Sequence, residues 1–135
     1  MNRAGILALL QAKVPDLLAV YAFGSRIDGT ADAHSDLDLA VLVAGYAEPV
    51  QLWELAGELA DVADCPVDLL DLRAASTVMQ YQIITRGERW WAGNSQVTLQ
   101  VALYEAAILS DKTELNRARA GLLADIAQRG SVLGG

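Results

Sequence analysis

Apolar residues recur along the chain with two different periods, which predict helices and strands in alternation. A stripe of apolar positions at helical spacing between Asn2 and Pro15 predicts an amphipathic first helix, with the asparagine as its cap. The following segment, 17–23, is apolar almost throughout, as in a strand that is buried on both faces. Segment 36–43 alternates between two faces and predicts a second strand.

The middle of the chain continues this alternation. After a turn at 45–49, an apolar stripe over 52–62 predicts a second helix. Segment 67–72 reads as a third short strand, and 76–84 as a helix capped by Ser76 or Thr77. The paired tryptophans at 90–91 suit a terminal strand packed on the core better than an exposed partner-binding patch.

A long helical region is expected from residue 94 to about 129. Its apolar positions from Val97 to Leu122 step by four and three, which forms a heptad seam. That seam could pair with a partner in a coiled coil or pack on the chain's own sheet. Asp111 and Glu114 resemble a capping box, so the region could break there into two helices.

These elements predict one α/β (α+β) domain over residues 1–135, with a core at about 5–92. Helices flank a small mixed β-sheet whose strand order the pattern leaves open. The composition, 53% hydrophobic and 20% charged, excludes a disordered chain.

The acidic residues are concentrated in one interval of the chain. The formal charge is −7, and the interval between Arg26 and Arg73 contains eleven acidic residues and no Lys or Arg. This balance argues against a protein that binds nucleic acid directly through phosphates. It favours a basic protein partner.

Cysteine usage and hydropathy bear on location. The single Cys65 is typical of a reduced, cytoplasmic protein, and no apolar run reaches the about 18 residues of a membrane-spanning helix. We therefore expect a cytoplasmic protein that does not act on a membrane.

The candidate chemistry begins with two carboxylates on one strand. Asp36 and Asp38 are two residues apart, so they share a face and repel each other unless a cation lies between them. Asp68 on the next predicted strand faces the same side. Oxygen ligands without nearby His or Cys favour magnesium or manganese over zinc, and three such carboxylates can hold two ions about 4 Å apart.

A candidate phosphate-binding turn precedes these carboxylates. Gly24 ends the first predicted strand and lets the backbone approach a phosphate closely, while Ser25 and the N–H groups after it can donate to that phosphate. Arg26 adds a fixed positive charge. Phosphate donors beside magnesium ligands predict a nucleoside triphosphate site.

The spacing of these groups resembles the DNA polymerase beta superfamily of nucleotidyltransferases, in which Gly-Ser is followed ten residues later by Asp-x-Asp, here GSRIDGTADAHSDLDLAVL. The short length, VDLLDL and IITRGERWW resemble its minimal nucleotidyltransferases, the MntA-type antitoxins of type VII-like pairs with HEPN-domain RNase toxins. The resemblance covers residues 5–110.

The resemblance implies a function and residue roles. Gly24 and Ser25 would hold the phosphates of ATP, Asp36 and Asp38 would bind magnesium, and Asp68 would be the third carboxylate and general base. The implied activity is magnesium-dependent transfer of AMP from ATP to a tyrosine of the HEPN toxin, which silences it.

Two other functions stay open at this point: a non-catalytic antitoxin that occludes its toxin, and a nucleotidyltransferase acting on a small-molecule antibiotic. Relatives often carry Arg-x-Arg-Gly after the Gly-Ser pair, whereas here Asp28 precedes Gly29. The triphosphate could therefore be neutralised by Arg26 or by an arginine further along, and the candidates are Arg73, Arg86 and Arg89.

Overall fold

A computed structural model of the chain describes residues 2–29, 35–94 and 96–110. The helices and strands follow the predicted order, with one short helix that the sequence pattern does not predict. They are α1 (Arg3–Lys13), β1 (Leu17–Phe23), α2 (Ser25–Asp28), β2 (Leu37–Val43), α3 (Pro49–Ala63), β3 (Val67–Asp71), the 3-10 turn η1 (Leu72–Ala74), α4 (Thr77–Arg86) and β4 (Glu88–Ala92), followed by a helix over 96–110.

The strands form one mixed sheet in the order β3-β2-β1-β4. β1 runs antiparallel to both β2 and β4, whereas β2 and β3 are parallel and joined through α3. Such a crossover is needed because parallel neighbours cannot be joined by a tight turn. The predicted fold class, a small mixed sheet flanked by helices, is confirmed.

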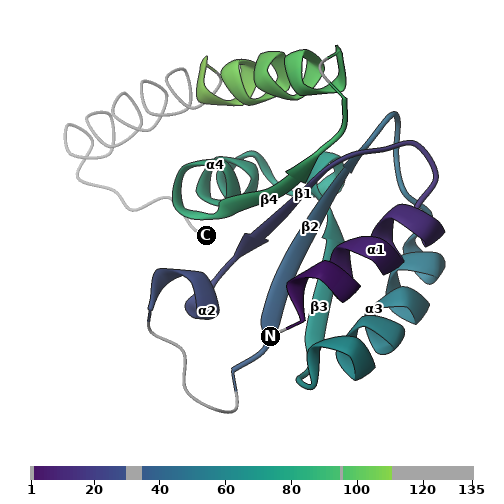
Figure 1. Ribbon diagram of the computed structural model, residues 1–135. Coiled ribbons are helices and arrows are strands. Elements are labelled where there is room, and N and C mark those ends of the chain that lie inside the picture. Colours follow the sequence, from purple (N-terminus) through teal and green to yellow (C-terminus); the bar gives the residue numbers. More distant parts are fainter. Residues whose placement is uncertain (1, 30–34, 95, 111–135) are drawn as a thin grey trace, which may run out of the picture.

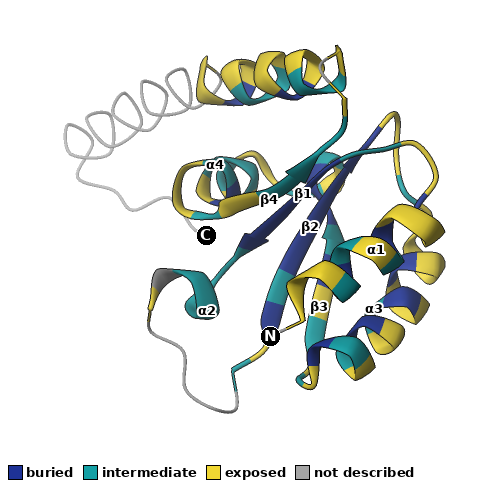
Figure 2. Ribbon diagram, in the orientation of Figure 1, coloured by how far each residue is buried: buried dark blue, intermediate teal, exposed yellow. Residues whose placement is uncertain are grey.

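Helices cover both faces of this sheet (Figure 1). On one face α1 and α3 pack on β2, where Ile6, Leu39 and Leu59 are fully buried. On the other face the core includes Tyr21 and Leu42. Buried residues therefore alternate between the two sides of β2, as the period of two along 36–43 predicts (Figure 2).

Side-chain caps fix where the main helices begin. The Asn2 side chain accepts from the Gly5 N–H at 3.0 Å, and the Ser76 hydroxyl accepts from the Met79 N–H at 3.2 Å. Glu48 caps α3 by accepting two backbone N–H groups. Each cap satisfies donors that the first turn leaves unpaired.

The helix over 96–110 packs against the chain's own sheet. Val101 is fully buried in the same cluster as Tyr21 and Leu42, which resolves the choice left open for the described part of the heptad seam. Asp111, Glu114 and the rest of the expected helical region lie outside the described residues. No helix within the described ranges combines the length and the apolar character needed to cross a membrane.

Candidate functional site

Gly24 ends β1 in a conformation that favours glycine. Its φ is +81° and its ψ is −162°, a region that other residues rarely adopt. A Cβ at this position would overlap the Asp38 carboxylate, and even the Asp38 Cγ would lie only 3.1 Å away. The backbone of the Gly-Ser turn therefore lies directly against the Asp38 carboxylate of the predicted site.

The short helix α2 follows this glycine at once. The Ile27 N–H donates to the Gly24 carbonyl at 3.0 Å, and Gly29 ends the turn in the left-handed conformation at φ +85°. The Arg26 Nε donates to the Ser35 carbonyl at 2.8 Å. Arg26 therefore ties the Gly-Ser turn to Ser35, the residue that precedes Asp36.

The three carboxylates gather at the same end of the sheet. Asp38 lies opposite Phe23 of β1 on one side and opposite Asp68 of β3 on the other. Directly opposed residues on neighbouring strands point to the same face, about 5 Å apart. Asp36 is exposed just before β2.

This arrangement changes the acidity of Asp38. Burial raises the pKa of its carboxyl, and the nearby charges of Asp68 and Asp36 raise it further. The site thus disfavours its own negative charge, which a cation would offset. An all-oxygen donor set with this electrostatic demand fits magnesium.

The carboxylates are neighbours, but they do not converge on one point. Among the described residues, no three acidic, histidine or cysteine side chains lie close enough to hold one metal ion. The strands bring Asp38 and Asp68 into register.

The four candidate arginines occupy different places. Arg86 is the last residue of α4. The next residue, Gly87, packs tightly against Phe23, because a Cβ built on Gly87 would lie only 3.2 Å from the Phe23 Cβ. Arg86 therefore lies near the end of β1 that carries the Gly-Ser turn, as does Arg26.

The other two arginines are engaged elsewhere. The Arg73 Nε donates to the Val43 carbonyl at 2.9 Å, and its guanidinium stacks 4.8 Å from the ring centre of Tyr104. This contact lies at the far end of β2 from Asp38. Arg89 forms an ion pair with Glu105 at 3.2 Å.

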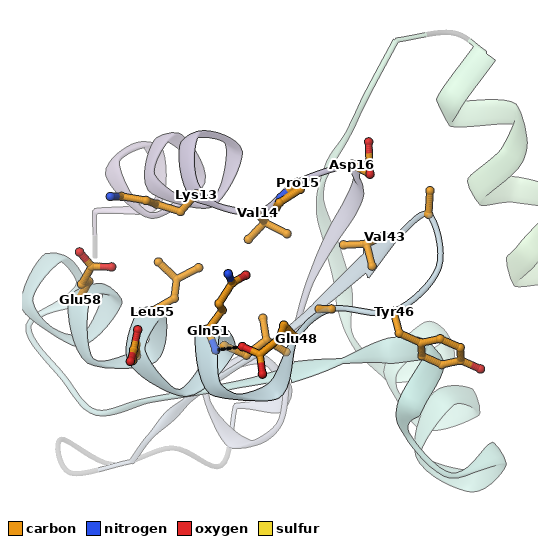
Figure 3. A pocket seen from close by; sticks show the side chains of 14 residues that line it. Lys13, Val14, Pro15, Asp16, Val43, Tyr46, Glu48, Gln51, Leu55 and Glu58 are labelled. Atoms are coloured by element: carbon orange, nitrogen blue, oxygen red, sulfur yellow. Dashed lines mark hydrogen bonds between the residues drawn. The ribbon is translucent and has the colours of Figure 1, made fainter.

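A separate hollow of about 620 Å³ opens between α1 and α3, at the end of the sheet opposite the carboxylates. Val14 and Leu55 point into it, and Glu48 and Glu58 lie on its margin (Figure 3). Val43 in its wall is five residues along β2 from Asp38, or about 17 Å at strand spacing. This hollow is therefore not part of the candidate site.

Comparison with known proteins agrees with the geometry. The family model described as "Polymerase beta, Nucleotidyltransferase" matches residues 6–96. The chain belongs to this nucleotidyltransferase family. Its mixed sheet and Gly-Ser turn are thus those of a family member, as the spacing in the sequence indicated.

Among individual nucleotidyltransferases, the chain is 44% identical over 91 residues to "Protein adenylyltransferase MntA" from Shewanella oneidensis. That match covers 67% of this chain and 66% of the relative, so it spans just under two thirds of the relative's length.

Solved structures extend the likeness to nearly the whole chain. A chain of a toxin–antitoxin complex with AMP-PNP has a TM-score of 0.80 and 35% identity, with 94% of this chain and 99% of that one covered. A chain of the complex between tri-AMPylated Shewanella oneidensis HEPN toxin and MNT antitoxin has a TM-score of 0.74 and 33% identity, covering 93% and 96%.

Sequence reasoning missed one group of polar residues beside the site. The Tyr21 hydroxyl donates to Glu105 at 2.5 Å, and Arg89 pairs with the same carboxylate, so the helix over 96–110 is tied to the sheet. Burial is the main cause that raises the pKa of the Tyr21 hydroxyl, and the nearby Glu105 carboxylate raises it further. The only signal of this group in the sequence is the hydroxyl of Tyr21, the one polar group among the side chains of the otherwise apolar segment 17–23.

Proposed function

We propose that this nucleotidyltransferase is a magnesium-dependent protein adenylyltransferase that acts as an antitoxin. It transfers AMP from ATP to a tyrosine of a HEPN-domain RNase toxin and thereby neutralises it. The single observation that carries the proposal is the register of Asp38 with Asp68 beside the Gly24 turn. The likeness to MntA and to its toxin complexes supports the choice of acceptor.

The residues of the Gly-Ser turn bind the triphosphate of ATP. Gly24 allows the closest backbone approach, and Ser25 offers its hydroxyl and N–H groups. Arg26 contributes positive charge while its Nε donates to the Ser35 carbonyl. Arg86 lies near the same end of the sheet and is assigned here to the outer phosphates.

The three carboxylates have two roles, which are to bind the metal ion and to remove the proton of the acceptor hydroxyl. Asp36 and Asp38 would hold magnesium, with Asp68 beside them as the third carboxylate; when bound, the metal would neutralise phosphate charge and make the acceptor hydroxyl more acidic. The acceptor oxygen attacks the α-phosphorus in line, the bond to pyrophosphate breaks, and Asp68 takes the hydroxyl proton. Asp68 is exposed, so a protein acceptor can reach it.

The test is transfer of label from α-labelled ATP to the purified cognate toxin. The paired change Asp36→Asn with Asp38→Asn should reduce labelling to background while the chain stays folded by circular dichroism. Labelling at the wild-type rate would show that these carboxylates are not the metal ligands.

Other outcomes separate the alternatives. An unlabelled yet inactive toxin in complex with the chain would indicate an occluding antitoxin. Labelling of a small-molecule antibiotic, with none on the toxin, would indicate an antibiotic-modifying enzyme.

A further inference from the structure

A second groove of about 770 Å³ runs between α3 and β3, and it reaches the candidate site. Its lining is mainly apolar and includes Trp53 and Gly57 of α3 and Leu69 of β3. Asp68, one of the three candidate carboxylates, is among the residues that line it. The groove is thus continuous with the place where the acceptor hydroxyl must be.

The wall formed by β3 is a free sheet edge. β3 is the outermost strand, and no strand of the described ranges pairs with its outer side (Figure 1). The Pro66 carbonyl accepts from the Leu37 N–H at 2.9 Å, toward β2. Because backbone groups alternate in direction along a strand, those of Val67 and Leu69 face outward and are available to another strand.

The register of this edge places side chains in a useful way. A segment paired with β3 would lie about 4.8 Å from it, and its residue opposite Asp68 would point to the same face as Asp68 and Asp38. The two flanking residues of that segment would point to the other face, toward α3. One side chain therefore meets the carboxylates while its neighbours enter the apolar groove.

Trp53 suits the role of an anchor for such a segment. Its side chain is 80% exposed, although tryptophan is a residue that proteins usually bury. Exposed tryptophans in apolar grooves are common binding hot spots. Gly57 faces open space, with nothing within 4 Å of a Cβ built on it, so the groove is unobstructed there.

The charge of the groove indicates the kind of segment. Its lining includes Glu54, Asp68 and Asp71 and contains no Lys or Arg. Asp71 is engaged by the N–H groups of Ala47 and Arg73, which leaves the other two carboxylates to face a ligand. A basic segment is favoured over an acidic one.

We propose that the groove between α3 and β3 binds the acceptor protein through an extended, basic segment that adds to the free edge of β3, with its acceptor residue opposite Asp68 and apolar neighbours beside Trp53. The inference rests on the proposed function, and it assigns the docking surface that the function requires.

The first test separates docking from chemistry. Trp53→Ala should raise KM for the toxin by about tenfold or more, as expected for a hot-spot tryptophan, with KM for ATP unchanged. Tyr46→Ala is the matched control, since Tyr46 is another aromatic side chain that is 75% exposed but does not line this groove. It should change KM for the toxin by less than about twofold.

A second pair of variants tests the space itself without threatening the fold. Gly57→Gln fills the groove and should raise KM for the toxin, whereas Gly57→Ala adds one methyl group and should raise it much less. Both changes favour the helix over glycine. Equal KM values for Gly57→Gln, Trp53→Ala and the wild type, with labelling intact, would overturn the groove and leave the proposed function standing.

Hydrogen exchange tests strand addition independently of transfer. In the full chain bound to toxin, the Leu69 amide should become protected, while the Leu70 amide, which faces β2, should change little. No added protection at Leu69 in a formed complex would overturn the proposal. A protected Leu69 amide together with a toxin that is never labelled would contradict the proposed function alone.

Discussion

Gly24→Ala is the change whose effect can be worked out most fully from the structure. The backbone at φ +81° and ψ −162° lies in a region that costs a residue with a Cβ about 1–3 kcal/mol. The Asp38 side chain must also leave its position, at a further cost of about 0.5–1.5 kcal/mol for an off-rotamer conformation. The free energy of unfolding should therefore fall by about 1.5–4.5 kcal/mol.

Gly29→Ala is the matched control. Gly29 has nearly the same φ, +85°, but an ordinary left-handed ψ of 7° and nothing within 4 Å of a built Cβ. Its replacement should cost only about 1–2 kcal/mol. Thermal melts should therefore place Tm of Gly24→Ala about 4–8 °C below that of Gly29→Ala.

Asp38→Ala identifies the cause of the difference. In that background, Gly24→Ala loses the clash and should approach the cost of Gly29→Ala. In the natural background, Gly24→Ala should also slow AMP transfer by about 100-fold, because the displaced carboxylate no longer holds its geometry. Equal Tm values for the two glycine variants, unchanged by Asp38→Ala, would refute the close contact.

Three further outcomes are expected. In metal-free chain, Asp68→Asn should lower the pKa of Asp38 toward its usual value in a carboxyl NMR titration, because one of the charges that raise it is gone. Since that pKa is raised in the folded state, stability toward urea should decrease as pH rises through it, and magnesium should remove this loss. Arg86→Ala should raise KM for ATP about tenfold and Arg73→Ala should not, a difference of about 1.4 kcal/mol. Equal KM values for the two variants would show that the outer phosphates do not bind beside Arg86. Tyr21→Phe should lower the free energy of unfolding by about 1 kcal/mol in denaturant titrations, since it removes a hydrogen bond to Glu105; no loss would mean that this bond does not stabilise the fold.

Much of the fold can be predicted from the sequence because its strands have clear periods. The alternation along 36–43 places Leu39 and Leu42 on opposite faces, and both are buried there. The same period of two puts Asp68 on the side of Asp38, which the register confirms. Face assignments of this kind depend only on local geometry.

Other features depend on contacts between distant segments, which periodicity does not encode. Helix α2 spans four residues, too few to show a helical period. The strand order, and with it the free edge of β3, follows from pairing over the whole chain. Arg73 and Arg86 look equivalent in sequence, yet the Val43 carbonyl holds one of them at the far end of the sheet.

Intact-mass spectrometry of the cognate toxin, after incubation with this chain, ATP and magnesium, tests the central claim most directly. We predict that the toxin gains the mass of at least one AMP, and that it gains none with the Asp36→Asn, Asp38→Asn chain. A toxin whose mass is unchanged by the natural chain, although the two proteins form a complex, would contradict it.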